Sequence, residues 1–282
     1  MNKQLLIHGT ASAQQLKELE VLTSATGISE YSEHCWQLQN AQIDEKFLKA
    51  LEAYCQSAQL DFAWLPAGLK LTDFGLLVMD MDSTLVTIET IDEMADYCGK
   101  KAEVAAITEA AMRGEISDYD TSLRRRLVLL EGLDTQALER VYLERMNLSP
   151  GAERLVQAAH VAGLKTLLVS GGFTFFTEKL KQRLQLSYAR SNTLGMVDHR
   201  LTGTVEGEIV NAEVKARIVQ ETCASLGLPT SAAIVMGDGA NDLKMMKLAG
   251  LSVAYRAKPV VRAQASVAFN FCGLDGLLSI LR

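Results

Sequence analysis

The sequence lacks the features of a secreted, membrane-bound or nucleic-acid-binding protein. Its five cysteines are odd in number and scattered, which argues against a disulfide framework and favours reduced thiols. No apolar run approaches the roughly 20 residues that cross a membrane, and residues 1–8 are too poor in apolar side chains for a secretory signal. A net charge of -6 disfavours nucleic acid. We therefore expect a cytoplasmic protein without a membrane or nucleic-acid partner.

The length and hydrophobic content indicate a folded chain with more than one part. Hydrophobic residues make up 48% of the sequence, which is enough for a sizeable core. A chain of 282 residues has room for a core domain and a smaller one.

The most informative segment ends a short apolar run with two aspartates. Residues 76–79 predict a buried strand, and Asp80 and Asp82 follow it directly. Two neighbouring carboxylates repel each other and lose water there, so a bound divalent cation is the simplest compensation. The carboxyl edge of a parallel sheet is also where α/β enzymes place their chemistry. An ordinary turn, in which Asp is common, explains this segment equally well on its own.

A second segment repeats the pattern. The apolar run 232–236 is followed by Gly237-Asp238-Gly239-Ala240-Asn241-Asp242. The glycines permit a tight turn and close approach to a ligand, and Asp238 and Asp242 are four residues apart, so both can face one side as a helix begins. Mg²⁺ prefers such oxygen ligands, together with water and substrate phosphate. Neither segment matches a calcium-binding loop, which needs acids at alternate positions and a closing Glu.

A third segment offers groups that suit phosphate. The predicted strand 164–169 ends at Ser170, Gly171 and Gly172, where a hydroxyl and backbone N–H groups can meet phosphate oxygens. A plain turn explains this segment equally well when taken alone. Lys215 lies near the start of a helix predicted from Ala212 to Leu226, where a cation opposes the helix dipole. A solvated surface lysine is the alternative.

These pieces, in this order, resemble the haloacid dehalogenase superfamily of phosphotransferases. Its motifs match Asp80-Met81-Asp82-Ser83-Thr84, Ser170, Lys215 and the acidic run 237–242, over roughly the last three quarters of the chain. Residues 80–85, 89–93, 122–126, 169–173 and 201–203 are similar to the phosphoserine phosphatase branch. The resemblance implies an α/β fold: a doubly wound, mostly parallel, Rossmann-like core sheet with an inserted helical cap.

We expect three domains. The catalytic core takes residues 74–87 and 149–282, and the helical cap takes residues 88–148. Residues 1–73 predict the order βαββαβ, the split unit of a small α+β ferredoxin-like domain. This pattern resembles the ACT-type regulatory domains found ahead of some phosphoserine phosphatases. A packing or dimerisation module, and hence a possible homodimer, is an equally good interpretation.

The resemblance implies a mechanism and a substrate. The reaction is hydrolysis of O-phospho-L-serine to serine and phosphate, the last step of serine biosynthesis, through an aspartyl-phosphate. Asp80 is the expected nucleophile, and Asp82 the expected general acid and base. Mg²⁺ would be held by Asp80, Asp238 and the backbone carbonyl of Asp82, with Asp242 supporting from outside the metal ligands. Ser170, the backbone N–H groups of Gly171 and Gly172, and Lys215 would stabilise the phosphate oxygens.

Substrate selectivity is expected from residues at or near the cap. Glu89 can pair with the ammonium of phosphoserine, and the guanidinium of Arg126 can bind its carboxylate. Side chains at 124, 125 and 126 point ~100° apart on a helix, so they cannot form one patch. By resemblance, Asn241 orients substrate or water, and Met112 and Tyr119 lie over the substrate. Core packing is the alternative for the last two.

Three other functions stay open at this point. The same residues suit a phosphotransferase that passes phosphate to an alcohol such as homoserine. They also suit a phosphatase acting on small phosphomonoesters in general, although Glu89 and Arg126 argue against it. A non-enzymatic sensor with an inert core is the third, and the presence of all the catalytic residues disfavours it.

Overall fold

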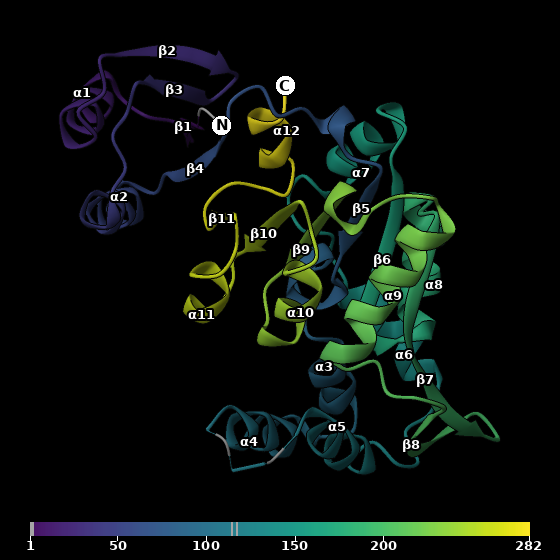
Figure 1. The fold of residues 1–282 in the computed structure, drawn as a ribbon. Coiled ribbons are helices and arrows are strands. Elements are labelled where there is room, and N and C mark those ends of the chain that lie inside the picture. The colour runs from purple at the N-terminus through teal and green to yellow at the C-terminus, as the bar shows by residue number, and fades with distance from the viewer. Residues whose placement is uncertain (1–2, 114, 117) are drawn as a thin grey trace.

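The computed structural model describes residues 3–113, 115–116 and 118–282, without the side chains of Glu45, Lys46 and Met112. Within these residues the strands form one sheet with the order β2-β3-β1-β4-β11-β10-β9-β5-β6-β7-β8 (Figure 1). The order reverses beside β5, as in doubly wound folds. No helix in the described part of the chain is long and apolar enough to span a bilayer.

The centre of this sheet is parallel from β11 to β7. Every residue of three of its strands is buried, as expected for strands that are covered on both faces. This arrangement confirms the predicted α/β core. Its strands are β5 (Leu76–Met79), β6 (Lys165–Phe173), β7 (Tyr188–Val197), β9 (Ala233–Gly237), β10 (Leu251–Tyr255) and β11 (Val267–Phe269).

Helices cover both faces of the parallel sheet. Alternate residues of β5 point to opposite faces, so Leu77 and Met79 belong to one apolar cluster and Leu76 and Val78 to another. The first cluster includes residues of α7 (Ala152–Val161), α8 (Thr174–Leu184) and α12 (Gly276–Ile280). The second includes residues of α9 (Ala212–Ser225), α10 (Leu243–Met246) and α11 (Pro259–Arg262).

The N-terminal region has the predicted βαββαβ order. Ser12 caps the first helix by accepting a hydrogen bond from the backbone N–H of Gln15, and Asp44 caps the second through Phe47. An apolar cluster of its own includes Leu5, Leu19 and Leu51. The elements are β1 (Lys3–His8), α1 (Ala13–Leu22), β2 (Gly27–Ser32), β3 (Cys35–Gln39), α2 (Glu45–Ala58) and β4 (Asp61–Pro66).

This region continues the core sheet. Strand β4 pairs with β11 in antiparallel fashion through Ala63–Val267 and Phe62–Ala268. The carboxylate of Asp61, which is only 1% exposed, accepts hydrogen bonds from the backbone N–H groups of residues 270–272 at 2.8–3.1 Å. The pairing covers an edge of β11 that would otherwise present unpaired backbone groups. The boundary at residue 73 stays a prediction.

The predicted helical insertion follows β5. It comprises α3 (Thr90–Tyr97), α4 (Lys101–Met112), α5 (Tyr119–Val128) and α6 (Gln136–Arg140). Its two connections to the core run side by side, with a bridge between Val86 and Leu148. Figure 1 shows α4 and α5 at the opposite end of the molecule from the N-terminal region. The bounds at residues 88 and 148 stay a prediction.

Strands β7 and β8 (Arg200–Glu206) form a hairpin that was not predicted from the sequence. Its turn places Asp198 and His199 in the left-handed region, with φ of 48° and 61°. The hairpin then pairs with the cap, since Gly132 donates its N–H to the carbonyl of Leu201, and Thr135 to that of His199. Part of its stabilisation therefore comes from residues distant in sequence.

Candidate active site

The site begins where three neighbouring parallel strands end. In register, Met79 of β5 lies beside Met236 of β9 and Leu168 of β6. Asp80, Ser170 and Asp238 come one or two residues later on their strands, so all three reach the same edge of the sheet. After Asp80 the chain turns sharply, with Ser83 at φ 54°. The structure thus brings these three predicted site residues together.

Lys215 joins two of the acids from the other side. It projects from the first turn of α9 and is completely buried. Its Nζ lies 2.7 Å from Oδ1 of Asp80 and 2.8 Å from Oδ1 of Asp242. Burial lowers the pKa of Lys215, but the carboxylates of Asp242 and Asp80 raise it by more, so the ammonium stays charged.

The carboxylates of Asp80, Asp238 and Asp242 form a compact cluster. One oxygen from each lies within 4.8 Å of the others. Burial first, and then Asp242, raises the pKa of Asp80 and brings that of Asp238 to about 7, although Lys215 opposes both rises. The ammonium of Lys215 cannot neutralise three carboxylates. A set of hard oxygen donors with excess negative charge fits a divalent cation, so this acidic triad has the character of a metal site.

Glycine and threonine complete the cluster. A Cβ at Gly237 would lie 2.4 Å from Oδ2 of Asp242, so only glycine leaves room for that carboxylate. The hydroxyl of Thr84 donates to Oδ1 of Asp238 at 3.3 Å. Thr84 belongs to a motif identified in the sequence, but its hydrogen bond to Asp238 was not predicted.

Asp82 lies apart from the triad, with its carboxylate turned towards the cap. Its Oδ1 accepts a hydrogen bond from the backbone N–H of Thr90 at 2.9 Å. Burial, followed by the nearby charge of Glu89, raises the pKa of Asp82 to about 7. A carboxyl group with this pKa can both give and take a proton near neutral pH.

The glycine pair lets the β6 loop approach Asp82 closely. A Cβ at Gly172 would lie 2.8 Å from Oδ2 of Asp82. The N–H of Gly172 donates to the hydroxyl of Ser170 at 2.8 Å, which fixes the side chain of that buried serine. Gly172 and the hydroxyl of Ser170 therefore lie close to Asp82, and the N–H of Gly172 is already used by Ser170.

Asn192 is a site residue that the sequence analysis missed. It is buried in β7, donates its Nδ2 to the carbonyl of Gly171 at 2.7 Å, and accepts from the N–H of Val210 at 2.8 Å. It thereby fixes the glycine loop against the segment that leads into α9. An Asn inside a strand is unfavourable on propensity alone, and that was the available signal.

The cap contributes polar groups above the strand ends. Glu89 is exposed and accepts a hydrogen bond from the hydroxyl of Ser83 at 2.6 Å. Partial desolvation by the surrounding protein raises its pKa, with Ser83 and Arg126 acting against that rise. Arg126 is half-buried, whereas Arg124 and Arg125 are exposed. Of the three arginines, Arg126 is the one whose charge acts on Glu89.

Two of the remaining predicted residues, Tyr119 and Asn241, contact the end of β6 and the loop that follows β9, respectively. Tyr119 donates its hydroxyl to the carbonyl of Gly171 at 3.3 Å, and burial raises its pKa to about 12, so it stays protonated. Asn241 is half-buried beside Gly239. Met112 ends α4, and its side chain lies outside the described residues.

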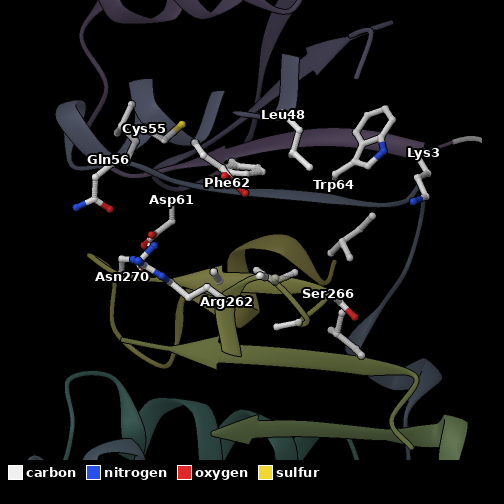
Figure 2. Close-up of a pocket in the computed structure, with 18 of the residues that line it drawn as sticks. Lys3, Leu48, Cys55, Gln56, Asp61, Phe62, Trp64, Arg262, Ser266 and Asn270 are labelled. Atoms are coloured by element: carbon white, nitrogen blue, oxygen red, sulfur yellow. Dashed lines mark hydrogen bonds between the residues drawn. The ribbon is translucent and has the colours of Figure 1, made fainter. Parts of the chain in front are cut away.

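A separate cavity of about 1000 Å³ lies between the N-terminal region and the core. Figure 2 shows its walls, and the lining residues that it labels include Leu48, Cys55, Phe62, Trp64, Arg262, Ser266 and Asn270. Its described lining includes no member of the acidic triad. Convergent acids and a buried lysine, rather than cavity size, therefore identify the candidate active site.

Comparisons with known proteins agree with this geometry. The haloacid dehalogenase-like hydrolase family matches residues 77–247. A phosphoserine phosphatase of Polaromonas sp. JS666 is 57% identical over 218 residues, which cover 76% of this chain and 92% of that relative.

Two crystal structures match over 99% of this chain. One is a haloacid dehalogenase family hydrolase from Salmonella enterica serovar Typhi, with a TM-score of 0.88, 32% identity and 98% of that chain covered. The other is a probable phosphoserine phosphatase from Vibrio cholerae, with a TM-score of 0.83, 37% identity and 86% of that chain covered. The chain belongs to the haloacid dehalogenase-like hydrolases, in their phosphoserine phosphatase family.

Proposed function

We propose that this chain is a Mg²⁺-dependent phosphatase that hydrolyses O-phospho-L-serine to L-serine and phosphate. The observation that carries the proposal is the buried Asp80, held by Lys215 inside an acidic triad at the ends of parallel strands. A relative of the chain from Polaromonas sp. JS666, 57% identical, is named a phosphoserine phosphatase, and this supports phosphoserine as the substrate.

Covalent transfer begins at Asp80. A carboxylate oxygen of Asp80 attacks phosphorus, the bond between phosphorus and the serine oxygen breaks, and an aspartyl-phosphate forms. Protonated Asp82 gives its proton to the departing serine oxygen. Asp82 then accepts a proton from the water that attacks the aspartyl-phosphate, which releases phosphate and restores Asp80. A pKa of about 7 for Asp82 supports both of its roles.

Donors around the phosphate stabilise its oxygens. The ammonium of Lys215 has three N–H groups, and Asp80 and Asp242 take two of them, which leaves one for phosphate. The hydroxyl of Ser170 and the backbone N–H of Gly171 supply further donors. Asp242 keeps Lys215 in place.

The metal ligands we propose are the carboxylates of Asp80 and Asp238 and the backbone carbonyl of Asp82. When bound, Mg²⁺ lowers the repulsion between the anionic nucleophile and the phosphate. The cluster of carboxylates supports a divalent cation at this place.

The cap residues would select phosphoserine. Glu89 would bind the substrate ammonium, and Arg126 its carboxylate. Tyr119 and Met112 would cover the substrate, and Asn241 would orient substrate or water. Arg126 is half-buried, whereas the two arginines that precede it are exposed, and this supports the assignment.

The experiment is phosphate release from O-phospho-L-serine with and without Mg²⁺, beside p-nitrophenyl phosphate, phosphothreonine and phosphohomoserine. We expect a Mg²⁺-dependent preference for phosphoserine that a chelator abolishes and added Mg²⁺ restores. Equal rates on all the esters would indicate a general phosphatase and overturn the substrate. Transfer to added homoserine in place of water would identify a phosphotransferase. Activity that survives chelation would refute the metal.

We further infer three domains, at 1–73, 74–87 with 149–282, and 88–148, and a cytoplasmic place for the protein. All five cysteines are free of disulfides, which supports a reducing compartment. Strand β2 forms one edge of the sheet, and its outer backbone can pair with a second copy. Light scattering of the full chain tests this homodimer.

A further inference from the structure

Helix α5 of the cap is held in different ways at its two ends. Beyond its carboxyl end, the loop 132–135 is tied to the β7–β8 hairpin by backbone hydrogen bonds: Gly132 N to Leu201 O, Leu201 N to Leu133 O and Thr135 N to His199 O, at 2.8–2.9 Å. At its amino end, two side-chain hydrogen bonds join described residues of α5 to the core. Tyr119 donates to Gly171 O at 3.3 Å, and Asp120 accepts from Nδ2 of Asn211 at 3.1 Å.

This asymmetry makes the amino end of α5 the end that can be released. Several backbone hydrogen bonds must break together to separate the loop 132–135 from the hairpin. A single, partly exposed side-chain hydrogen bond contributes little to the stability of the closed cap. Asp120 and Asn211 are both half-buried, so water can replace either partner when they separate. Substrate entry requires some such opening, because Asp80, Ser170 and Lys215 beneath the cap are almost completely buried.

Asn211 links this contact to the catalytic lysine. Its Oδ1 accepts from the N–H of Val214 and caps α9, while its Nδ2 donates to Asp120. The N–H of Lys215 donates to the carbonyl of the same Asn211 at 2.8 Å. An amide has a separate donor and acceptor. The side chain of Asn211 can therefore cap the helix that carries Lys215 through its oxygen and bind the cap through its nitrogen.

The position of the amino end of α5 also determines where the proposed substrate-binding side chains lie. Tyr119, Ser122 and Arg126 are spaced by three and four residues, so they share one face of the helix. Arg126 donates to the carbonyl of Ser122, one turn behind it. A shift of the amino end of α5 would therefore move Tyr119 directly and Arg126 with it.

We propose that Asp120 and Asn211 form a latch that holds the cap over the active site, which makes Asp120 a positioning residue for phosphoserine turnover. The inference rests on the proposed function for its kinetic consequence. Without the latch, the open state of the cap is more populated, so part of the substrate's binding free energy is used to close the cap. KM for phosphoserine should then rise about threefold to tenfold, while kcat at saturation stays within about twofold, since bound substrate restores the closed state.

Paired variants test the latch. Asp120→Ala removes the acceptor, and Asn211→Ser removes the amide donor while keeping an oxygen that can cap α9. Each should raise KM by a similar factor, and the double variant should raise it no further than either alone. Asp120→Asn keeps an acceptor oxygen and should restore KM to within about twofold of the parent. Additive effects, an unchanged KM in both single variants, or failure of Asp120→Asn to restore KM would overturn the latch.

A matched control is the partly exposed ion pair between Glu139 of α6 and Lys179 of α8, at 3.0 Å, which also joins cap and core. Glu139→Ala should leave KM within about twofold, because such pairs contribute little. An equal rise in KM for Glu139→Ala would show that any cap–core contact suffices, and would overturn the specific role of Asp120.

A second readout does not depend on turnover. Amide hydrogen exchange over residues 119–128, measured with inorganic phosphate present, should be about threefold to tenfold faster in Asp120→Ala and Asn211→Ser than in the parent. Exchange over the hairpin residues 200–206 should be unchanged. If the parent fails to hydrolyse phosphoserine but these exchange rates change as expected, the proposed function fails and the latch stands. Unchanged exchange at α5 overturns the latch, whatever the activity.

Discussion

The core and the N-terminal region contribute strands to one sheet, yet only the core gathers its strand ends into a site. Strands β5, β6 and β9 run in the same direction, so Asp80, Ser170 and Asp238 reach one edge. Strand β1 is antiparallel to both β3 and β4, which sends neighbouring strand ends to opposite edges. Parallel pairing therefore gathers functional side chains at one edge of a sheet, and membership of the same sheet does not do so by itself.

Two buried aspartates make the same contrast at the level of single residues. Asp61 is satisfied by three backbone N–H groups, and it serves to join the N-terminal region to the core. Asp80 shares one lysine with Asp242 and lies close to a third carboxylate, that of Asp238, so its charge is only partly compensated. The first arrangement is structural, whereas the second leaves a carboxylate available to a metal ion and a phosphate.

The largest effect is expected from Asp80→Asn, which tests whether Asp80 differs in role from Asp61. An amide oxygen is a poor nucleophile, so turnover of phosphoserine should fall by at least about a thousandfold, with no phosphoenzyme. Phosphate release and acid-quenched labelling measure both quantities. Asp61→Asn is the matched control, and it should lower the melting temperature while turnover of the folded protein stays within about twofold. Substantial turnover in Asp80→Asn would contradict the nucleophile.

Lys215→Met should damage both activity and stability. It leaves Asp80 and Asp242 buried without their cation, which should lower the free energy of unfolding by about 3–5 kcal/mol in metal-free buffer. Turnover should fall by about a hundredfold or more, because a phosphate donor is lost as well. Urea unfolding and phosphate release measure the two effects. Lys244→Met on the exposed surface is the control, and equal losses there would argue against a special role for Lys215.

Arg126→Ala should have a smaller and selective effect. Loss of a guanidinium that binds carboxylate should lower kcat/KM for phosphoserine by about tenfold to a hundredfold. Turnover of p-nitrophenyl phosphate, which has no carboxylate, should change by less than about threefold. The exposed neighbour provides the control variant Arg125→Ala. Equal losses on both substrates would remove Arg126 from recognition.

The smallest expected effect is a pH dependence in the N-terminal region. Burial lowers the pKa of His8 below its ordinary 6.5, while Asp61 and Asp275 act against that shift. The unfolded chain then binds more protons than the folded one, so stability from His8 is present above pH 6.5 and is lost as the pH falls below it. Urea unfolding at about pH 8 and about pH 5.5 should show a smaller loss in His8→Gln than in the parent. An equal loss in both proteins would exclude His8 as the cause.

Much of the core followed from local sequence. Short apolar runs ending in Asp80, Ser170 and Gly237 predicted both the strands and the edge at which they end, because buried parallel strands are apolar throughout and change character abruptly at their carboxyl ends. The starts of three helices are likewise specified locally, since the side chains of Ser12, Asp44 and Asn211 accept hydrogen bonds from backbone N–H groups three residues later.

The hairpin of β7 and β8 was not readable in this way. Its strands contain Asn192 and Gly195, which propensity disfavours, and its stabilising partners include the cap loop 132–135. The pairing of β4 with β11 is likewise a contact between segments about 200 residues apart, and nothing in either segment specifies the other.

The sequence predicted the candidate site residues and their local setting, because strand ends, caps and glycine turns are encoded within a few positions. Only the tertiary structure decided that Lys215, which resembles a surface lysine in its own helix, is completely buried between Asp80 and Asp242. It also decided that Asn211 reaches Asp120 of the cap. Such charge and hydrogen-bond partnerships depend on distances between remote segments, and those distances exist only once the sheet has assembled.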